Sequence, residues 1–452
     1  MTAAAADTSE SWFSSFRRSK LLVKIITFVA LLLHTLTSST LVPLLPPMLV
    51  KIGRTPTGGN ASSFDSFGAS DIYARNLTVI SNFSGALGYI VSARWIADFL
   101  FTIVTGFLVD RFGNRWPMLV GVLFNMASIF GYAFVPNIAS LIVCRILQGI
   151  GASLTYVSSL ALISETFQDD SERNKALSQV FLGYTVGLLL GYAVGPILFR
   201  FTNLMVPFLL LGVLASVDGL LRILKPADDT NTRQDAKNVK ISKYCVILFE
   251  PYILAGLICN LSLFFGLGIY LATGADWMIY QLRADMWKIG LVLFISLLFM
   301  ILGDLLAGWY SLKHQWVWLI IALWLYASGM AIYPACTSIW HVIGTEGLAR
   351  LGIGIGLCCI NSLLARVTDL RFGSATYGVT FGLFAATVDF GFILGSLFGG
   401  FLVDIMTFAW LYRAEAIFVF LASFSALIYR KMPAAVKDKG EYEKFPAGEN
   451  YD

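Results

Sequence analysis

Gly106-Phe-Leu-Val-Asp-Arg-Phe-Gly-Asn-Arg115 is a short charged turn between two apolar runs that are each long enough to cross a lipid bilayer. Asp110, Arg111 and Arg115 lie at a predicted membrane surface, where the carboxylate is expected to pair with guanidinium groups and with the end of a neighbouring helix. Gly106 allows two backbones to approach closely, and Gly113 permits the tight turn that returns the chain to the membrane. A plain turn that obeys the positive-inside rule explains the three charges equally well.

The composition places the whole chain in a membrane. Of 452 residues, 57% are hydrophobic and 13% are charged, whereas soluble proteins carry about a quarter charged residues. The net charge of +4 is spread along the loops, so nucleic acid is not an expected partner. The six cysteines show no metal-ligand spacing and are interpreted as small core residues, so neither a metal nor a cofactor is expected. No metalloprotease, serine-hydrolase or phosphate-loop motif occurs, which argues against an enzyme.

Apolar runs of about 20 residues predict membrane-spanning helices, because lipid offers no hydrogen-bond partner to an open sheet edge. We predict twelve, near residues 25–45, 84–109, 116–135, 138–164, 176–199, 204–222, 252–274, 288–312, 316–335, 348–368, 374–402 and 414–430. The predicted fold is an all-α membrane protein of two six-helix halves. Its expected parts are an N-terminal tail 1–24, a first half 25–221, a polar linker 222–247, a second half 248–430 and a C-terminal tail 431–452.

An internal repeat supports the division into halves. The paired stretches are Arg145-Ile-Leu-Gln-Gly-Ile-Gly151 with Arg350-Leu-Gly-Ile-Gly-Ile-Gly356, Gly191-xxx-Gly195-Pro196 with Gly391-xxx-Gly395-Ser396, and Gly106 with Gly308. Their offsets are 205, 200 and 202 residues. Offsets this similar predict two parallel, pseudo-symmetric halves with a binding site between them near the bilayer midplane.

The distribution of Lys and Arg predicts the orientation. If the N-terminus is cytosolic, 21 of these residues fall on the cytosolic side, Arg222 among them, and eight fall on the other side, Arg350 among them. The positive-inside rule then puts both termini in the cytosol. The loop 46–83 faces a lumen or the exterior and carries glycosylation sequons at Asn60, Asn76 and Asn82, of which Asn82 lies nearest the membrane.

Several of these motifs resemble those of the major facilitator superfamily. They are the stretch 106–115, the pattern Arg145-xx-Gln148-Gly149, and the glycine ladder Gly183, Gly187, Gly191, Gly195-Pro196. In that family the first stretch acts as a breakable latch between two moving halves. The ladder makes a smooth helix face for close packing, and Pro196 weakens one backbone hydrogen bond so that the helix can bend. An ordinary close-packed helix pair explains the ladder's spacing as well.

A narrower resemblance rests on four stretches whose order and spacing are similar to those of the vesicular amine and acetylcholine transporters. They are Arg17-Arg-Ser-Lys20, Val42-Pro-Leu-Leu-Pro46, Glu250-Pro-Tyr-Ile-Leu254 and Asp369-Leu-Arg371. The resemblance implies exchange of lumenal protons for a cytosolic amine, in an intracellular vesicle membrane, with a glycosylated first lumenal loop.

The family's functional residues match this chain only in part. Its second-helix lysine falls on Arg94, which keeps the charge, and its tenth-helix aspartate falls on Asp369. Its first-helix aspartate, which binds the amine, falls on His34, and an imidazole offers no fixed negative charge. Its seventh-helix glutamate falls on Ala272. Its eleventh-helix aspartate falls near Ala385, with Asp389 one turn further on.

Six ionisable residues fall inside predicted spans, and we expect them to face a cavity or one another. They are His34, Arg94, Asp98, Arg145, Asp304 and Asp389. A charged group costs about 2.5–3.5 kcal/mol at a helix centre. Arg94 and Asp98 are four residues apart, so they can form either a self-neutralised pair or part of a site.

Each of the other four also has two interpretations. For Asp304 and Asp389 a protonatable or cation-binding role is favoured over a neutral buried carboxyl. The resemblance implies that Arg145 lies beside the proton pathway. His34 is either a substrate contact or a satisfied core histidine.

These observations predict a secondary active transporter of a small organic solute, with an amine-like cation favoured. We expect a monomer in a lipid bilayer that works by proton-coupled antiport and alternating access. A uniporter, an organic-anion carrier and a non-transporting receptor or scaffold are the alternatives.

Overall fold

The computed structural model describes residues 19–53, 77–223, 246–284, 286–309, 314–372 and 376–432. Within them, 12 helices are long and apolar enough to cross a membrane, which confirms the all-helical prediction. The helices are α2 Lys20–Gly53, α4 Leu77–Phe112, α5 Arg115–Ala133, α6 Ile138–Thr166, α7 Asp170–Phe201, α8 Met205–Ile223, α11 Pro251–Leu282, α12 Met286–Trp309, α13 Gln315–Ile332, α14 Ile339–Arg371, α15 Tyr377–Ile405 and α16 Phe408–Ser423. Two short 3-10 helices, η3 Tyr333–Ala335 and η5 Phe424–Lys431, follow α13 and α16.

Several helices extend beyond the apolar runs that predict them. Because α2 continues to Gly53 and α4 begins at Leu77, the predicted loop 46–83 is wrong at both ends, and Asn82 lies inside α4. The other two sequons lie outside the described residues. The 34 residues of α2 span about 51 Å at 1.5 Å per residue, well beyond a hydrocarbon core of about 30 Å. Hydropathy therefore finds the centre of each helix and misses its polar ends.

Side-chain caps mark where three helices begin. Asn137 accepts a hydrogen bond from the backbone N–H of Ser140 at the start of α6, and Asp169 caps α7 in the same way. Ser338 caps α14, which begins nine residues before the predicted start near 348. Such caps satisfy backbone N–H groups that the first helical turn leaves unpaired.

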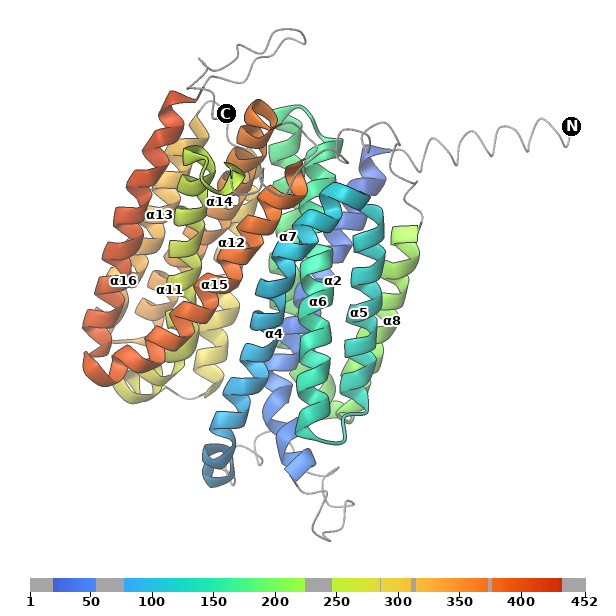
Figure 1. Ribbon diagram of the computed structural model, residues 1–452. Helices are drawn as coiled ribbons and strands as arrows, with labels where there is room; N and C mark the ends of the chain where they lie inside the picture. The colour runs from blue at the N-terminus through green and yellow to red at the C-terminus, as the bar shows by residue number, and fades with distance from the viewer. Residues whose placement is uncertain are drawn as a thin grey trace, which may run out of the picture.

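The helices form two bundles that stand side by side (Figure 1). The first half comprises α2 to α8 and the second comprises α11 to η5. The start of α2 and the end of the C-terminal helical segment, drawn in red, lie at the same end of the molecule, which we call the Lys20 end after the first residue of α2 (Figure 1). The five described cysteines are unpaired and buried, as expected of core residues.

Glycines bring helices together in the same way in each half. A Cβ atom on Gly187 would lie 2.1 Å from Thr35 Oγ1, so α7 packs directly on α2. A Cβ atom on Gly395 would lie 2.0 Å from the carbonyl oxygen of Phe265, so α15 packs directly on α11. Glycines of the repeat thus allow close packing of the equivalent helix pair in each half, as the sequence repeat predicts.

The two halves meet along α4 with α15 and along α7 with α12 and α14, and we call these contacts the seam. A Cβ atom on Gly106 would lie 2.8 Å from the carbonyl oxygen of Gly378. Its repeat counterpart Gly308 faces Ser178, whose Oγ would lie 2.7 Å from such an atom. These contacts lie on the Lys20 side of the bundle, so the halves are closed against each other there.

Two arginines that the charge count assigns to the two membrane sides are paired within helices. Arg222 belongs to α8, where it pairs with Asp218 and donates a hydrogen bond to the carbonyl oxygen of Met118 at 2.8 Å. Arg350 belongs to α14, where its Nε lies 2.7 Å from Glu346 Oε1. Arg222 lies in the last turn of α8 and Arg350 lies well inside α14, and an acidic residue four positions earlier neutralises each arginine. Without these two arginines, 20 Lys and Arg residues fall on the predicted cytosolic side and seven on the other side, so the predicted orientation is the same.

Candidate functional site

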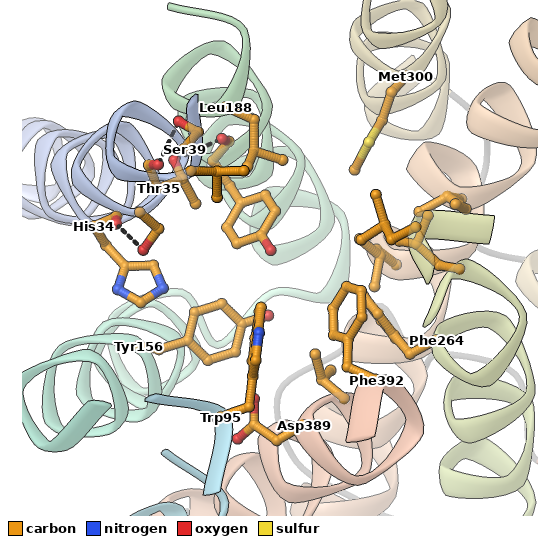
Figure 2. Close-up of a pocket in the computed structure, with 18 of the residues that line it drawn as sticks. His34, Thr35, Ser39, Trp95, Tyr156, Leu188, Phe264, Met300, Asp389 and Phe392 are labelled. Atoms are coloured by element: carbon orange, nitrogen blue, oxygen red, sulfur yellow. Dashed lines mark hydrogen bonds between the residues drawn. The ribbon is translucent and has the colours of Figure 1, made fainter. Parts of the chain in front are cut away.

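A cavity lies between the two halves (Figure 2). Four helices of the first half (α2, α4, α6 and α7) and four of the second (α11, α12, α14 and α15) supply its walls. The empty space between these residues is about 1110 Å³, including solvent at the mouth. The cavity lining combines apolar and aromatic side chains with a few charged groups, which is typical of a binding site for an organic solute.

Aromatic side chains from both halves form much of the wall. Trp95 of α4 stacks on Phe392 of α15, with ring centroids 4.7 Å apart. Tyr156 of α6 and Tyr184 of α7 meet edge to face with centroids 6.2 Å apart. Such rings bury apolar groups and present electron-rich faces to cations.

Two carboxylates and one guanidinium lie together in this wall. Arg94 Nη2 is 3.7 Å from Asp98 Oδ2, so the predicted pair forms. Asp389 of α15 lines the same cavity and is 4% exposed, and its Oδ2 has no hydrogen-bond partner among the described residues. The charges of Arg94, Asp98 and Asp389 act on one another. With two acids facing one base, the cluster can accept one more positive charge.

His34 of α2 points into the cavity, where Figure 2 shows its ring beside Tyr156. The ring centroids of these two side chains are 6.1 Å apart, and Tyr184 lies 6.5 Å away. Thr35 fixes this part of α2, because its hydroxyl donates to the carbonyl oxygen of Tyr184 at 2.8 Å. His34 therefore faces the cavity and contributes a ring there instead of an anion.

Asp304 and Asp369 lie at the seam, and neither lines the cavity. Asp304 accepts a hydrogen bond from Thr185 Oγ1 at 2.6 Å, across the two halves. Asp369 pairs with Arg173 of the first half and accepts a hydrogen bond from Tyr377. The partner of Asp304 thus comes from the other half of the chain, and its protonatable or cation-binding role stays a prediction.

Arg145 also lies outside the cavity, inside the first half. Its Nη1 donates to Gln148 Oε1 at 3.1 Å, and the hydroxyl of Tyr132 donates to the same oxygen at 2.8 Å. The side chain is buried in this network. The hydrogen bond from Arg145 to Gln148 therefore explains why these residues are three positions apart in the motif.

Asp110 meets the end of a neighbouring helix, as the first stretch predicts. Its two carboxylate oxygens accept hydrogen bonds from the backbone N–H groups of Gly378 at 2.6 Å and Val379 at 3.0 Å, at the start of α15. Gly113 has a φ of 78°, the left-handed conformation that a tight turn requires. Arg111 is exposed at the same end.

Arg350 is the charged residue of the described cavity lining that sequence reasoning misses. It lines the cavity from α14, beside the ring of Tyr270 at 5.6 Å. The internal repeat contains the signal for it, since Arg350 is the counterpart of Arg145, which lies within a helix. At the seam, sequence reasoning also misses Asp170, whose Oδ2 lies 3.4 Å from Arg366 Nε in the other half.

Known proteins share both the sequence pattern and the fold. The model of the Major Facilitator Superfamily matches residues 27–376. The human chromaffin granule amine transporter is 28% identical over 330 residues, which cover 72% of this chain and 61% of that protein. This chain thus matches less than two thirds of that relative's length. The probable vesicular acetylcholine transporter-A of Danio rerio is 26% identical over 404 residues, which cover 86% of this chain and 75% of that protein.

Two solved structures have the same fold at low identity. The human organic anion transporter MFSD10 gives a TM-score of 0.74 at 18% identity, over 90% of this chain and 99% of that one. The proton:xylose symporter XylE, a member of the superfamily, gives 0.66 at 15% identity, over 93% of this chain and 96% of that one. These proteins are transporters by name, in agreement with the expectation that the chain is not an enzyme. The family match over residues 27–376 and the shared twelve-helix fold establish that this chain belongs to the Major Facilitator Superfamily.

Proposed function

We propose that this protein is a secondary transporter that exchanges an organic cation for protons across a membrane. The observation that carries the proposal is the cluster of Asp98, Asp389 and Arg94 in the wall of the central cavity. The names of its relatives, which include amine transporters, support the same substrate class.

The charge balance of the cluster gives a physical basis for exchange. Arg94 neutralises one carboxylate, and the second negative charge can be balanced by a proton or by the ammonium group of a substrate. One site cannot hold both cations at once, so arrival of one favours departure of the other. The rings of Trp95 and Phe392 then hold the apolar part of the substrate beside Asp389.

Alternating access requires the cavity to open to one side at a time. The seam closes the Lys20 end, while the cavity extends toward the opposite end through Val42 of α2 and Tyr192 of α7. The excess of Lys and Arg supports a cytosolic Lys20 end, so this conformation faces a lumen or the exterior. Exchange of faces then requires the contacts of Asp110 and Asp369 with the opposite half to break, which is the latch role proposed for the stretch 106–115.

The proposal predicts proton-driven uptake in a purified system. The protein is reconstituted in liposomes with an acidic interior, and uptake of a labelled monoamine and of labelled tetraethylammonium is measured. Saturable uptake that a proton ionophore abolishes is expected, and Asp389→Asn removes it. Asp218→Asn is the matched control, because Asp218 is equally buried but pairs with Arg222 away from the cavity. Uptake without dependence on the pH gradient indicates a uniporter, and no saturable uptake of any solute indicates a receptor or scaffold.

An organic-anion carrier is the second candidate, because Arg94 and Arg350 both line the cavity. A thermal-shift screen of amines, amino acids and organic anions separates the candidates, since a ligand at 100 times its Kd stabilises the folded protein by about 2.7 kcal/mol. Stabilisation by an anion that is lost in Arg350→Gln favours the anion carrier. Stabilisation by an amine that is lost in Asp389→Asn favours the cation exchanger. We also propose a monomeric protein of an intracellular vesicle membrane, which its resemblance to vesicular transporters supports.

A further inference from the structure

We propose that Glu415, together with Glu346 and Arg350, forms a proton-binding site inside the second six-helix half. This site is distinct from the cluster around Asp389 in the cavity wall. It takes up and releases a proton at a pair of buried glutamates, of which, within the described part of the chain, only Glu346 is paired with an arginine.

The two glutamates come from different helices and are both withdrawn from solvent. Glu346 of α14 is 0% exposed and its Oε1 lies 2.7 Å from Arg350 Nε. Glu415 of α16 is 2% exposed and its Oε1 accepts a hydrogen bond from the hydroxyl of Tyr326 at 2.7 Å. The second carboxyl oxygen of each glutamate has no hydrogen-bond partner among the described residues. Each glutamate therefore keeps an unused position at which a proton can bind.

The neighbouring helix is shaped to leave space for Glu415. Gly266 of α11 faces it, and a Cβ atom there would lie 2.2 Å from Glu415 Oε1 and 2.5 Å from the hydroxyl of Tyr326. Any side chain at this position would displace the carboxyl group. One turn further along α11, the hydroxyl of Tyr270 is buried and has no partner among the described residues, and its ring lies 5.6 Å from Arg350 Cζ.

The charges of this cluster do not balance unless it holds a proton. The charge of Glu346 acts on Glu415, and Arg350 is the cation that pairs with Glu346. Among the described residues, the hydroxyls that interact with these three charges or lie next to those hydroxyls belong to Tyr192 of α7, Tyr270 of α11, Tyr326 of α13, Tyr333 of η3 and Tyr412 of α16. A second ionised carboxylate in this apolar interior would lack a counter-charge, which is strongly unfavourable.

The buried pair in the first half provides the contrast. Asp218 and Arg222 form an ion pair of one acid and one base, and Arg222 also donates hydrogen bonds to the carbonyl oxygen of Met118 and to the hydroxyl of Thr155. That pair is balanced without a proton. The cluster in the second half contains two glutamates and one arginine. We therefore expect its excess carboxyl group to bind and release the proton.

Arg350 connects this site to the cavity. Its guanidinium lines the cavity and is held by Glu346, whose charge acts on Glu415. A proton gained at Glu415 thus changes the charge beside a group that faces the transported solute. This coupling to transport rests on the proposed function, whereas proton binding itself does not.

Infrared spectroscopy of the purified protein tests the site without any substrate. In a pH titration we expect a protonated-carboxyl C=O band that is lost in Glu415→Gln and retained in Asp218→Asn. A band that persists unchanged in both Glu415→Gln and Glu346→Gln overturns the proposal. If Glu415→Gln does not fold, Tyr326→Phe replaces it, because that change removes only the hydroxyl that donates to Glu415. The band is then expected to shift in frequency, and an unshifted band overturns the proposal.

The transport assay distinguishes this proposal from the function on which its coupling rests. In liposomes, Glu415→Gln is expected to retain uptake but to move one fewer proton per substrate, whereas Asp389→Asn loses uptake. An unchanged proton stoichiometry in Glu415→Gln refutes the coupling. Because the infrared measurement needs no transport, absence of uptake in the wild type refutes the proposed function alone.

Discussion

The carboxylate of Asp110 is the clearest single point at which to weaken the seam. It belongs to the first half, yet both of its oxygens accept hydrogen bonds from the first turn of α15 in the second half. The change Asp110→Asn keeps the size of the side chain but removes its charge and one acceptor. We expect it to shift the protein toward conformations in which the Lys20 end is open.

The magnitude follows from the two hydrogen bonds. Hydrogen bonds to a charged group contribute about 1.5–3 kcal/mol, and a negative charge at a helix N-terminus adds about 0.3–1 kcal/mol. Since asparagine keeps one acceptor, the loss is about 2 kcal/mol. At 1.4 kcal/mol for each factor of ten, the ratio of open to closed seam rises about 30-fold.

Alkylation of a cysteine buried at the seam measures this ratio. Val109 is 2% exposed and faces Gly378, so Val109→Cys, in a protein whose six native cysteines are replaced, reacts with a maleimide only when the seam opens. The rate is expected to rise about 30-fold when Asp110→Asn is added, if opening is fast compared with alkylation.

Asp169→Asn is the matched control for this experiment. Asp169 caps α7 at the same end of the molecule by accepting a hydrogen bond from Glu172 at 2.9 Å, but both residues belong to one half. Its loss weakens a helix terminus without biasing the two halves. The reasoning is refuted if Asp110→Asn leaves the alkylation rate unchanged, or if Asp169→Asn raises it equally.

Three further outcomes are expected. Arg94→Ala should lower folded yield and activity more than the double change with Asp98→Ala, because stranding a buried carboxylate costs about 3–5 kcal/mol; a folded but inactive double variant would show that Arg94 does more than pair. His34→Asp should tighten binding of a labelled monoamine by at least about tenfold, since a new anion faces the cavity; no gain would remove His34 from the site. Protein from a eukaryotic host should carry glycan on Asn60 or Asn76; unchanged gel mobility after glycosidase treatment would contradict the proposed orientation.

The fold is predictable from the sequence because lipid constrains it at the level of the backbone. A span needs about 20 apolar residues, and close helix packing needs glycine, so both leave local patterns. Gly187 and Gly395 mark equivalent contacts of their helices, and the stretch 106–115 marks the turn that meets α15. These features depend on short segments of chain.

The site is less predictable, because the partner of a charged residue depends on how helices from distant parts of the chain are rotated. Asp389 and Asp304 look alike in sequence, yet one faces the cavity and the other is bound by Thr185. The sequence analysis does not identify Glu346 as a membrane residue, because hydropathy predicts that this helix begins near residue 348, whereas α14 begins at Ile339. Its pairing with Arg350 at a spacing of four residues is the local signal that could have revealed it.

In the internal repeat, equivalent backbone positions carry side chains with different contacts. Gly149 packs against α4 with its Cβ position 3.0 Å from the backbone nitrogen of Asp98, and Gly354 packs against α12 with its Cβ position 3.0 Å from that of Asp304. The two aspartates are therefore structural counterparts. One turn earlier, however, Asp98 has Arg94, whereas Asp304 has Met300 at the equivalent position. Asp98 pairs with Arg94 and lines the cavity, whereas Asp304 accepts a hydrogen bond from Thr185 across the seam. The same backbone position thus lines the central cavity in one half and joins the two halves in the other.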